Sequence, residues 1–169
     1  SKIALLEVDE LALTTAHAEL KRAFPDLEIV SVLGNCGDPA VISHTLRIAE
    51  PDAVFHAAAY KQVPLLERQL REAVRNNVLA TEVVARSCRE AGVGTFAFIS
   101  TDKAVDPVNV LGATKRFAEM VCQTLDDRQS TRFVTVRFGN VLDSAGSVVP
   151  LFREQIRQGG PVTVTGPEV

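Results

Sequence analysis

The regular alternation of short apolar runs with longer amphipathic segments constrains the fold of this chain most. Runs typical of buried strands, rich in β-branched and aromatic residues, occupy 2–6, 29–33, 53–56, 96–100 and 133–138. Helical sequence separates them and continues to the C-terminal part, at 9–24, 38–49, 64–91, 113–125 and 148–157. Strands and helices that alternate at this spacing predict βαβ units, which form parallel sheets covered on both faces. We therefore predict an α/β protein with a Rossmann-like, doubly wound parallel sheet.

Capping and breaking residues refine these boundaries. Asp9 and Asp38 are good N-cap residues, and Pro39 suits the first position of a helix. The long helical segment 64–91 is expected to break near Arg68 to Arg71. A last short strand is predicted at 162–164.

Composition limits the class of protein. A length of 169 residues with 46% hydrophobic residues suits one soluble domain that buries a core. The net charge of -3, without a basic cluster, argues against nucleic acid as a partner. Three widely spaced cysteines suit reduced, structural thiols in the cytosol. We expect no metal site, and no apolar run approaches the length of a membrane span.

Chemistry-bearing residues gather after the strand at 96–100. Ser100, Thr101, Asp102 and Lys103 follow each other there, and Lys115 comes where a helix begins. In a parallel α/β sheet, ligands bind at the carboxyl ends of the strands. An acid beside a potential base at this place can move protons on a bound substrate, although a solvated surface pair is the simpler alternative.

Four motifs carry a resemblance to a known family. They are His-Ala-Ala-Ala-Tyr-Lys at 56–61, Ser-Thr-Asp-Lys at 100–103, Gly-Ala-Thr-Lys-Arg at 112–116 and Val-Arg-Phe-Gly-Asn-Val at 136–141. Together they resemble the sugar-nucleotide 4,6-dehydratases of polysaccharide biosynthesis, within the extended short-chain dehydrogenase/reductase superfamily. The resemblance runs from Ile3 to Val169 and places the strand at 2–6 second in the family's sheet. It implies a fragment of one NAD-binding domain over 1–169 that lacks the first βα unit and its glycine-rich turn, with 139–169 leading into a substrate-binding region.

The resemblance also implies cofactor-binding positions. Glu7, past the first strand, would accept hydrogen bonds from the adenosine ribose and repel a 2′-phosphate, which favours NAD over NADP; a surface glutamate that opens a helix is the alternative. Asn35 and Cys36 hold the turn where relatives contact adenine, with Asn35 in place of the usual Asp. The remaining cofactor positions are Ala57, Ala58, Ala59, Asn77, Ser100 and Lys115. The three alanines would equally suit tight helix-sheet packing, and His56 fits a satisfied buried histidine better than a ligand.

Position 111 departs from the superfamily pattern. The superfamily pairs a tyrosine with a lysine four residues later, and here that tyrosine is Leu111, four residues before Lys115. A branch that resembles the UDP-N-acetylglucosamine 4,6-dehydratases with retained configuration at C5 carries an apolar residue there. In that branch Thr101 and Asp102 are the candidates for relaying the C4 hydroxyl proton.

The resemblance implies a function. The expected activity is an NAD-dependent lyase that converts UDP-N-acetylglucosamine to its 4-keto-6-deoxy derivative for capsule or other surface polysaccharide, with Lys103 as base at C5 and a protonated Asp102 as acid at C6. The catalytic candidates are thus Thr101, Asp102, Lys103 and Lys115. Substrate positions are Lys61, Arg137, Asn140 and Ser147, where Arg137 as a plain surface charge is the alternative. A sugar-nucleotide 4-epimerase and a catalytically silent nucleotide-sugar binding module remain open, and the fragment by itself is expected to be inactive.

Partners and location follow from the same reading. We expect a nucleotide-sugar substrate and a homo-oligomer paired through the helices around 70–88 and 113–125. We expect no direct membrane contact from this segment. The location would be cytoplasmic, or that of the cytoplasmic domain of a membrane-anchored parent.

Overall fold

The computed structural model describes residues 1–126, 130–141 and 148–163, and the chain divides into two compact units, Ser1–Arg137 and Phe138–Val169. The described strands are β1 Lys2–Glu7, β2 Glu28–Leu33, β3 Ala53–His56, β4 Thr95–Thr101 and β5 Arg132–Phe138. The described helices are α1 Glu10–Ala23, α2 Pro39–Ala49, α3 Val63–Leu66, α4 Leu70–Val74, the π-helix η1 Arg75–Leu79, α5 Ala80–Glu90, the 3₁₀-helix η2 Asp102–Ala104, α6 Val110–Leu125 and α7 Val148–Arg157.

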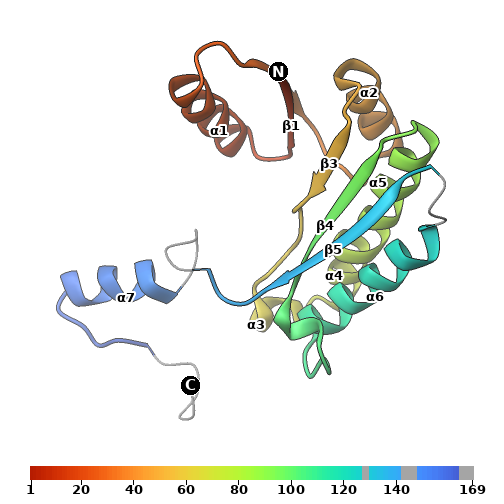
Figure 1. The fold of residues 1–169 in the computed structure, drawn as a ribbon. Coiled ribbons are helices and arrows are strands. Elements are labelled where there is room, and N and C mark those ends of the chain that lie inside the picture. The colour runs from red at the N-terminus through yellow and green to blue at the C-terminus, as the bar shows by residue number, and fades with distance from the viewer. Residues whose placement is uncertain (127–129, 142–147, 164–169) are drawn as a thin grey trace. The chain divides into compact units, whose positions relative to one another are not determined.

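The strands pair in parallel, as the alternation predicts. β1 runs parallel to β2, with Lys2 opposite Glu28, and β3 runs parallel to β4, with Ala53 opposite Thr95. β4 lies between β3 and β5, and β5 begins beside the start of β4, where the Arg132 N–H donates to Gly94 O at 3.0 Å. Among the described strands no hydrogen-bonded ladder joins β1 to β3, so the predicted parallel arrangement is divided into two sheets (Figure 1).

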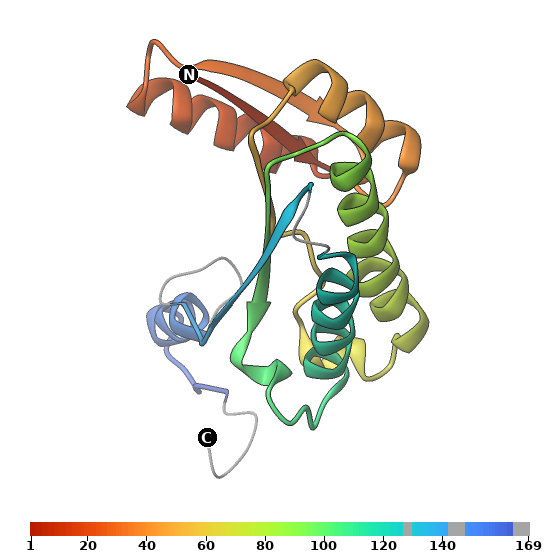
Figure 2. The ribbon, with the colours of Figure 1, turned by 45° about the vertical axis from the view of Figure 1, so that its right-hand side comes forward.

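Helices cover both sides of this arrangement, which confirms the Rossmann-like prediction. α1 contacts β1 and β2, α2 contacts β1 and α5, and α5 and α6 pack on each other and on β3 and β4. Figure 1 shows α1 and α2 on opposite sides of the β1–β2 pair, and Figure 2 shows α5 and α6 side by side against the three-stranded sheet. The buried core between these layers consists of Ile42, Leu46, Val84, Ala85, Cys88, Val93, Phe96, Phe98, Ala118, Cys122 and Leu125.

The predicted caps of the first two helices are confirmed. Asp9 Oδ1 accepts a hydrogen bond from the Ala12 N–H at 2.7 Å, and Asp38 Oδ1 accepts one from the Ala40 N–H at 2.8 Å, with Pro39 at the first helical position. Each carboxylate satisfies an amide that the first turn of its helix leaves without a backbone partner.

The start of α6 differs from the prediction by three residues. The helix begins at Val110 rather than Ala113, because Asn109 Oδ1 caps the Gly112 N–H at 2.8 Å and Glu67 Oε1 accepts from the Val110 N–H at 2.8 Å. The Glu67 cap comes from a residue 43 positions away, so local sequence does not reveal it. Leu111 and Gly112 therefore lie inside the first turn of α6.

Two further boundaries bear on the predictions. The break in the segment 64–91 is confirmed, since α3 ends at Leu66 and α4 begins at Leu70, but the π-helix η1 that follows was not predicted. The predicted last strand is wrong for Val162 and Thr163, which have no strand structure, and Val164 lies outside the described residues. No helix among the described residues combines the length and apolarity that a membrane crossing needs.

Candidate functional site

The end of β4 carries a connected set of polar side chains. Thr101 Oγ1 donates to Asp102 Oδ1 at 2.9 Å, and Lys103 Nζ donates to the same oxygen at 3.2 Å. The Thr101 hydroxyl also receives the Lys103 N–H at 3.4 Å, which closes the turn into η2. The structure thus brings the three predicted catalytic residues of this turn together on one carboxylate oxygen.

The protonation state of Asp102 differs from the prediction. Hydrogen bonds from Thr101 and Lys103 lower the pKa of the Asp102 carboxyl below its ordinary value. The side chain is 58% exposed, so burial raises the pKa of Asp102 less than these hydrogen bonds lower it. Asp102 is therefore ionised in this structure, and the expectation that it is held protonated is wrong for this state.

Lys115 lies buried beside the same strand end. Its Nζ donates to Ile99 O at 2.7 Å and lies 4.6 Å from the centroid of the Phe98 ring. Burial lowers the pKa of Lys115 to about 8, because the charged form loses hydration, while the nearby Cys122 and Glu119 favour the charged form. A buried ammonium near neutrality at the carboxyl edge of a parallel sheet is typical of a functional position.

Gly112 lets the turn approach α6 closely. A Cβ atom built on Gly112 would overlap Lys103 O and would lie 3.0 Å from the Lys103 carbonyl carbon. Both obstacles are backbone atoms, so only glycine fits without displacing the turn. The glycine thereby sets the position of Lys103 relative to α6.

Glu119 joins two of the predicted site residues to α6. Its buried carboxylate accepts Ser100 Oγ at 2.6 Å, Arg137 Nε at 2.8 Å and Nη2 at 2.5 Å, and Arg116 Nη1 at 3.0 Å. Ser100 and Arg137, predicted to contact cofactor and substrate, thus point to Glu119 here. The sequence analysis did not identify Glu119; its signal was an acid four residues after Lys115, on the same face of the helix.

The pKa of Glu119 predicts an acid-dependent stability. Burial by itself would raise the pKa of Glu119, but hydrogen bonds from Arg137, Ser100 and Arg116 outweigh it and lower the pKa to about 2. Because the folded-state pKa is below the ordinary 4.5, the stabilisation is complete above pH 4.5 and is lost as the pH falls through about 2. Urea unfolding should show a larger free energy of unfolding for wild type than for Glu119→Gln at pH 7. This difference in free energy should shrink by roughly 3 kcal/mol as the pH falls from 7 to about 2. A difference that stays constant with pH would contradict the assignment.

Asn77 fastens the loop after β3 to α6. Its Oδ1 accepts the Tyr60 N–H at 2.8 Å, and its Nδ2 donates to Tyr60 O at 3.0 Å and to Thr114 Oγ1 at 3.2 Å. The side chain is fully buried and stands in the π-turn of η1, a distortion that is frequent at functional sites. In this structure the Asn77 amide binds the loop backbone and Thr114. Its predicted contact with the cofactor stays a prediction.

Replacing Asn77 should therefore cost stability. We expect Asn77→Ala to lower the free energy of unfolding by about 3 kcal/mol, since it removes the fully buried amide together with its hydrogen bonds to Tyr60 and Thr114. The matched control is Asn76→Ala, which removes one hydrogen bond to Asn77 Oδ1. Denaturant unfolding of both variants checks this, and equal losses would refute a special role of Asn77.

The expected adenosine-binding edge lies at the ends of β1 and β2. Glu7 Oε1 accepts the backbone N–H groups of Val8 at 2.8 Å and Asp9 at 3.0 Å, which fixes the carboxylate. Burial and, less strongly, the Glu7 charge raise the pKa of the Cys36 thiol, so Cys36 lies near Glu7 and packs against the core. Asn35 Oδ1 accepts the Gly37 N–H at 2.8 Å and lines a surface hollow that also includes Tyr60.

The remaining predicted residues follow β3 and β5. Ala57 and Ala58 are exposed after β3 and Ala59 is half-buried, while Lys61 is exposed just beyond them. Asn140 follows β5 in the second unit, and Ser147 lies outside the described residues. Their predicted roles in binding remain predictions.

His56 is a satisfied core residue, as expected. The Thr81 hydroxyl donates to Asn77 O at 2.8 Å, so the 3.0 Å contact between His56 Nε2 and Thr81 Oγ1 places the imidazole proton on Nε2. Burial and the charge of Lys115 lower the pKa of His56 to about 4, which keeps the ring neutral.

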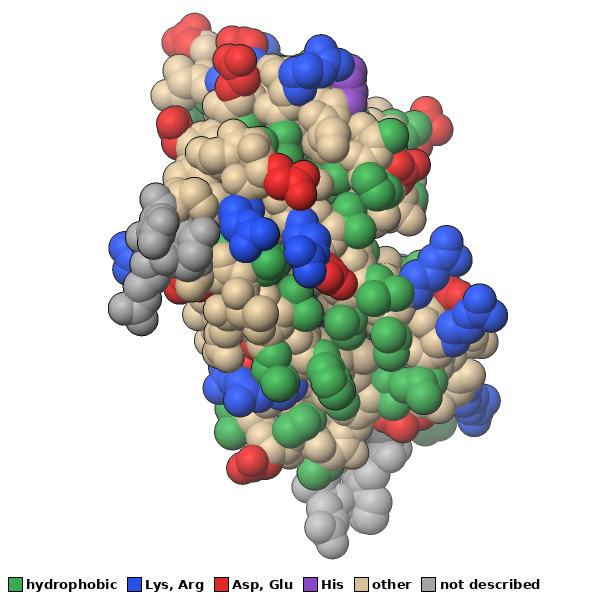
Figure 3. Space-filling view, turned by 90° about the vertical axis from the view of Figure 1, so that its right-hand side faces the viewer, with side chains coloured by type: hydrophobic (Ala, Val, Ile, Leu, Met, Phe, Trp, Pro, Cys, Tyr) green, Lys and Arg blue, Asp and Glu red, His purple; other side chains and the backbone are tan. Residues whose placement is uncertain are grey.

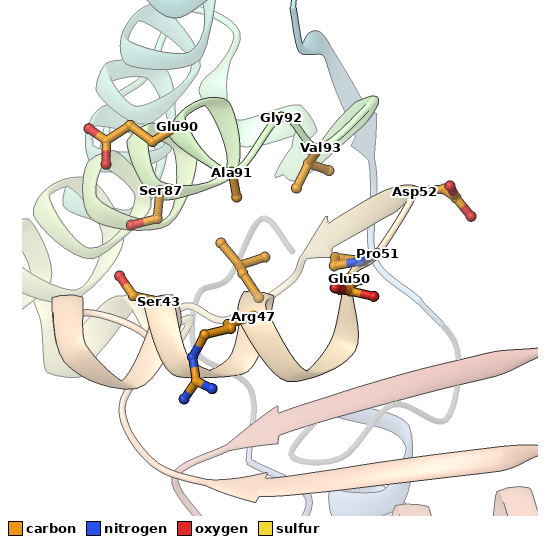
Figure 4. A pocket seen from close by; sticks show the side chains of 11 residues that line it. Ser43, Arg47, Glu50, Pro51, Asp52, Ser87, Glu90, Ala91, Gly92 and Val93 are labelled. Carbon is orange, nitrogen blue, oxygen red and sulfur yellow. The ribbon is translucent and has the colours of Figure 1, made fainter.

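A hollow elsewhere in the first unit does not coincide with these groups. It lies between the ends of α2 and α5, lined by side chains such as Arg47, Ser87 and Val93, at the amino ends of β3 and β4 (Figure 4). Ligands of parallel α/β sheets bind at the opposite, carboxyl ends. We therefore place the candidate site at Thr101–Lys103 and Lys115.

The fold is Rossmann-like, and the hydrogen-bonded side chains of Thr101, Asp102 and Lys103 lie at the carboxyl end of β4. Comparison with family models makes the assignment specific, since the model described as "Polysaccharide biosynthesis protein" matches residues 1–169. The chain belongs to this polysaccharide biosynthesis family.

Individual relatives agree with this family. The chain is 51% identical over 170 residues to the capsular polysaccharide biosynthesis protein CapD of Staphylococcus aureus, covering 99% of this chain and 28% of CapD. It is 35% identical over 171 residues to the inverting UDP-N-acetylglucosamine 4,6-dehydratase of Campylobacter jejuni, covering 98% of this chain and 49% of that enzyme. The chain thus spans between about a quarter and a half of these relatives.

A solved structure agrees in fold. The DesIV double mutant, a dTDP-glucose 4,6-dehydratase from Streptomyces venezuelae solved with NAD bound, superposes with a TM-score of 0.81 at 21% identity, covering 98% of this chain and 56% of that one. At this identity the likeness concerns the fold.

Proposed function

We propose that the protein containing this chain is an NAD-dependent 4,6-dehydratase of a UDP-linked hexose, most directly UDP-N-acetylglucosamine. One observation carries the proposal: Thr101 and Lys103 both donate to one Asp102 oxygen beside the buried Lys115. A sugar dehydratase needs a proton acceptor at the C4 hydroxyl, a base at C5 and an acid at C6. This set of groups can supply all three, and the similarity to a dehydratase supports the reaction class.

The described residues fit an NAD cofactor. The Glu7 carboxylate, held by two backbone amides through one oxygen, suits the two hydroxyls of an adenosine ribose and disfavours a 2′-phosphate. The exposed stretch Ala57–Ala58 has small side chains that permit close backbone approach to a ligand. A bound nicotinamide would supply reversible hydride transfer between sugar and cofactor. Lys115, which lies at the same edge of the sheet, would contact this cofactor.

The side chains of the Thr101–Lys103 turn account for the proton transfers. Thr101 accepts the proton of the C4 hydroxyl and passes its own along the existing hydrogen bond to Asp102. The C4 ketone acidifies the C5 proton, which neutral Lys103 removes as protonated Asp102 donates a proton to the departing C6 hydroxyl. Lys103 finally returns a proton to C5. The net change is the loss of one water, with no net oxidation.

The ionised Asp102 is compatible with this cycle. Elimination leaves Asp102 ionised, as it is in this structure. The cycle itself begins with neutral Lys103 and ionised Asp102, and Asp102 gains its proton from the C4 hydroxyl through Thr101, along the hydrogen bond of 2.9 Å. Exclusion of water by a bound substrate would favour the neutral pair, because burial destabilises both charged forms.

A 4-epimerase would use C4 chemistry only, and a silent binding module none. Leu111, where the superfamily has its tyrosine, is 7% exposed and packs with Leu66 and Ala73, so Thr101 must replace the tyrosine as proton acceptor.

Turnover in deuterated water separates the three functions. A dehydratase places deuterium at C5 of the sugar, visible by NMR, whereas an epimerase inverts C4 without label at C5, and a silent module leaves the sugar unchanged.

The apolar surface of α4, η1 and α6 supports a homodimer. Leu70, Val74, Leu79, Phe117 and Met120 are between 37% and 61% exposed on these elements. Figure 3 shows hydrophobic side chains gathered on this face of the molecule. Exposed apolar patches of this kind mark interaction surfaces, and a second copy of the chain presents the same patch.

Charge introduced into this patch should weaken the dimer. We expect the double variant Phe117→Glu with Met120→Glu to raise the dimer dissociation constant at least about 100-fold, since two buried apolar contacts become repelling charges. Leu11→Glu on α1, which is 75% exposed away from this patch, is the control and should leave the dimer intact. Analytical ultracentrifugation measures both. A wild type that is monomeric at micromolar concentration would contradict the proposal.

A further inference from the structure

Three residues on one face of α6 contact consecutive parts of the β4–η2 segment. Gly112 touches the Lys103 backbone, Lys115 Nζ binds Ile99 O, and Glu119 Oε1 receives the Ser100 hydroxyl. Their spacing of three and four residues places them in one row along the helix. The row therefore holds the strand end on both sides of the Thr101–Asp102 peptide unit.

Glu119 is the deepest contact of this row and the most strongly bound. It is 0% exposed, and each of its two carboxylate oxygens accepts two hydrogen bonds. Two arginines from different elements, Arg116 on α6 and Arg137 on β5, share this single carboxylate. A fully satisfied buried charge of this kind fixes the groups around it, and removing it leaves two guanidinium groups without their counter-charge.

Glu119 also links the ends of two neighbouring strands. Ser100 is the residue before Thr101 on β4, and Arg137 is near the end of β5. A guanidinium that donates two hydrogen bonds to a carboxylate binds it in one orientation. The direction of the Arg137 side chain therefore fixes the plane of the Glu119 carboxylate. The plane in turn determines where the Ser100 hydroxyl, and with it the following turn, can lie.

We propose that Glu119 is a positioning residue that holds the end of β4 on α6 and thereby sets the Thr101–Asp102–Lys103 turn beside Lys115. It touches neither substrate nor cofactor in this account and acts through Ser100 and Arg137. The effect on turnover rests on the proposed function, whereas the effect on the order of the strand end does not.

Hydrogen exchange followed by mass spectrometry tests the positional part in the full-length protein. Glu119→Gln keeps the size and one acceptor but loses the charge, and we expect amides of 99–104 to exchange at least about tenfold faster. Amides of β2, on the other sheet, should keep their wild-type rates. The matched control is Glu82→Gln, which removes an exposed pair with Arg86 (2.8 Å) and should change neither segment. Unchanged exchange at 99–104 in Glu119→Gln would overturn the proposal.

Kinetics test the functional part. With sugar nucleotide and NAD, we expect Glu119→Gln to lower kcat about tenfold with KM within threefold, since misplaced reacting groups slow the chemical step. The pKa of Lys115 should fall in this variant, because Glu119 favours the charged lysine, and the pH profile of kcat should move to lower pH with it. A folded variant with wild-type kcat and pH profile would overturn this part. If wild type shows no turnover at all, the proposed function fails, and hydrogen exchange still decides the positional part.

A second variant keeps the proposal falsifiable if Glu119→Gln unfolds globally, as fast exchange in β2 would show. Ser100→Ala removes one donor and leaves both arginines on Glu119. We expect faster exchange confined to 99–104 in this variant. Exchange equal to that of wild type would overturn the proposal.

Discussion

Replacing Asp102 by asparagine is expected to slow formation of the 4-keto-6-deoxy sugar by about 1,000-fold, within the range that one general acid contributes. Asparagine still accepts a hydrogen bond from Thr101 or Lys103, but it cannot carry the proton that the C6 hydroxyl needs to leave. The side chain is 58% exposed, so the variant should fold with nearly unchanged stability. Product formation measured by mass spectrometry, with NAD affinity measured in parallel, checks the prediction.

A matched control lies four residues further along the chain. Asp106→Asn makes the same chemical change in the same exposed loop, and asparagine tolerates the positive φ of 43° found there. We expect it to keep wild-type turnover. If Asp102→Asn formed product at the wild-type rate, or lost NAD binding together with turnover, the acid assignment would fail.

A methyl group at Gly112 should be nearly as damaging. In Gly112→Ala the new Cβ meets the Lys103 carbonyl, so η2 and α6 must separate. Displacement of catalytic groups by about 1 Å typically costs on the order of 100-fold in rate, and we expect a loss of that size in kcat. Overpacking should also lower the free energy of unfolding by about 1–3 kcal/mol.

A second glycine variant separates the effect on kcat from the effect on stability. Gly94→Ala places a Cβ 3.2 Å from Asp52 O, a tight backbone contact at the amino end of β4, far along the strand from Thr101. We expect it to lose some stability and keep kcat. Comparable kcat losses in both variants would indicate general destabilisation rather than displacement of the turn.

The elements that the sequence predicted well depend on local signals. Strand and helix periodicity placed β3 and α7 at their observed boundaries, and the caps Asp9 and Asp38 act over three residues or fewer. The start of α6 was missed although its N-cap, Asn109, is local; a second contact at this start, from Glu67, comes from a distant part of the chain. The π-turn of η1 was missed because its reason is tertiary: it accompanies the buried Asn77 amide that binds Tyr60 and Thr114.

The predictions about the candidate site were also correct where they depend on neighbouring residues and incomplete where they depend on tertiary contacts. Because Thr101, Asp102 and Lys103 are consecutive in the sequence, they could be predicted to lie together. The structure shows hydrogen bonds from Thr101 and Lys103 to Asp102. The ionised state of Asp102 in this structure was not predicted, since it depends on exposure and on the direction of two donors, and its protonation during catalysis stays a prediction. Glu119 was not identified because its three partner residues, which donate four hydrogen bonds, converge from β4, α6 and β5 only in the folded chain. Binding by Glu7, Lys61, Asn140 and Ser147 remains a prediction.

The central claim is the dehydratase reaction, and one measurement tests it most directly. The full-length protein is incubated with NAD and UDP-N-acetylglucosamine, and the sugar nucleotide is followed by mass spectrometry. The account predicts a product lighter by one water, formed without net consumption of NAD. An unchanged mass with NAD and the sugar nucleotide both bound would contradict it; a new stereoisomer of that mass would identify an epimerase, and an unaltered sugar a silent binding module.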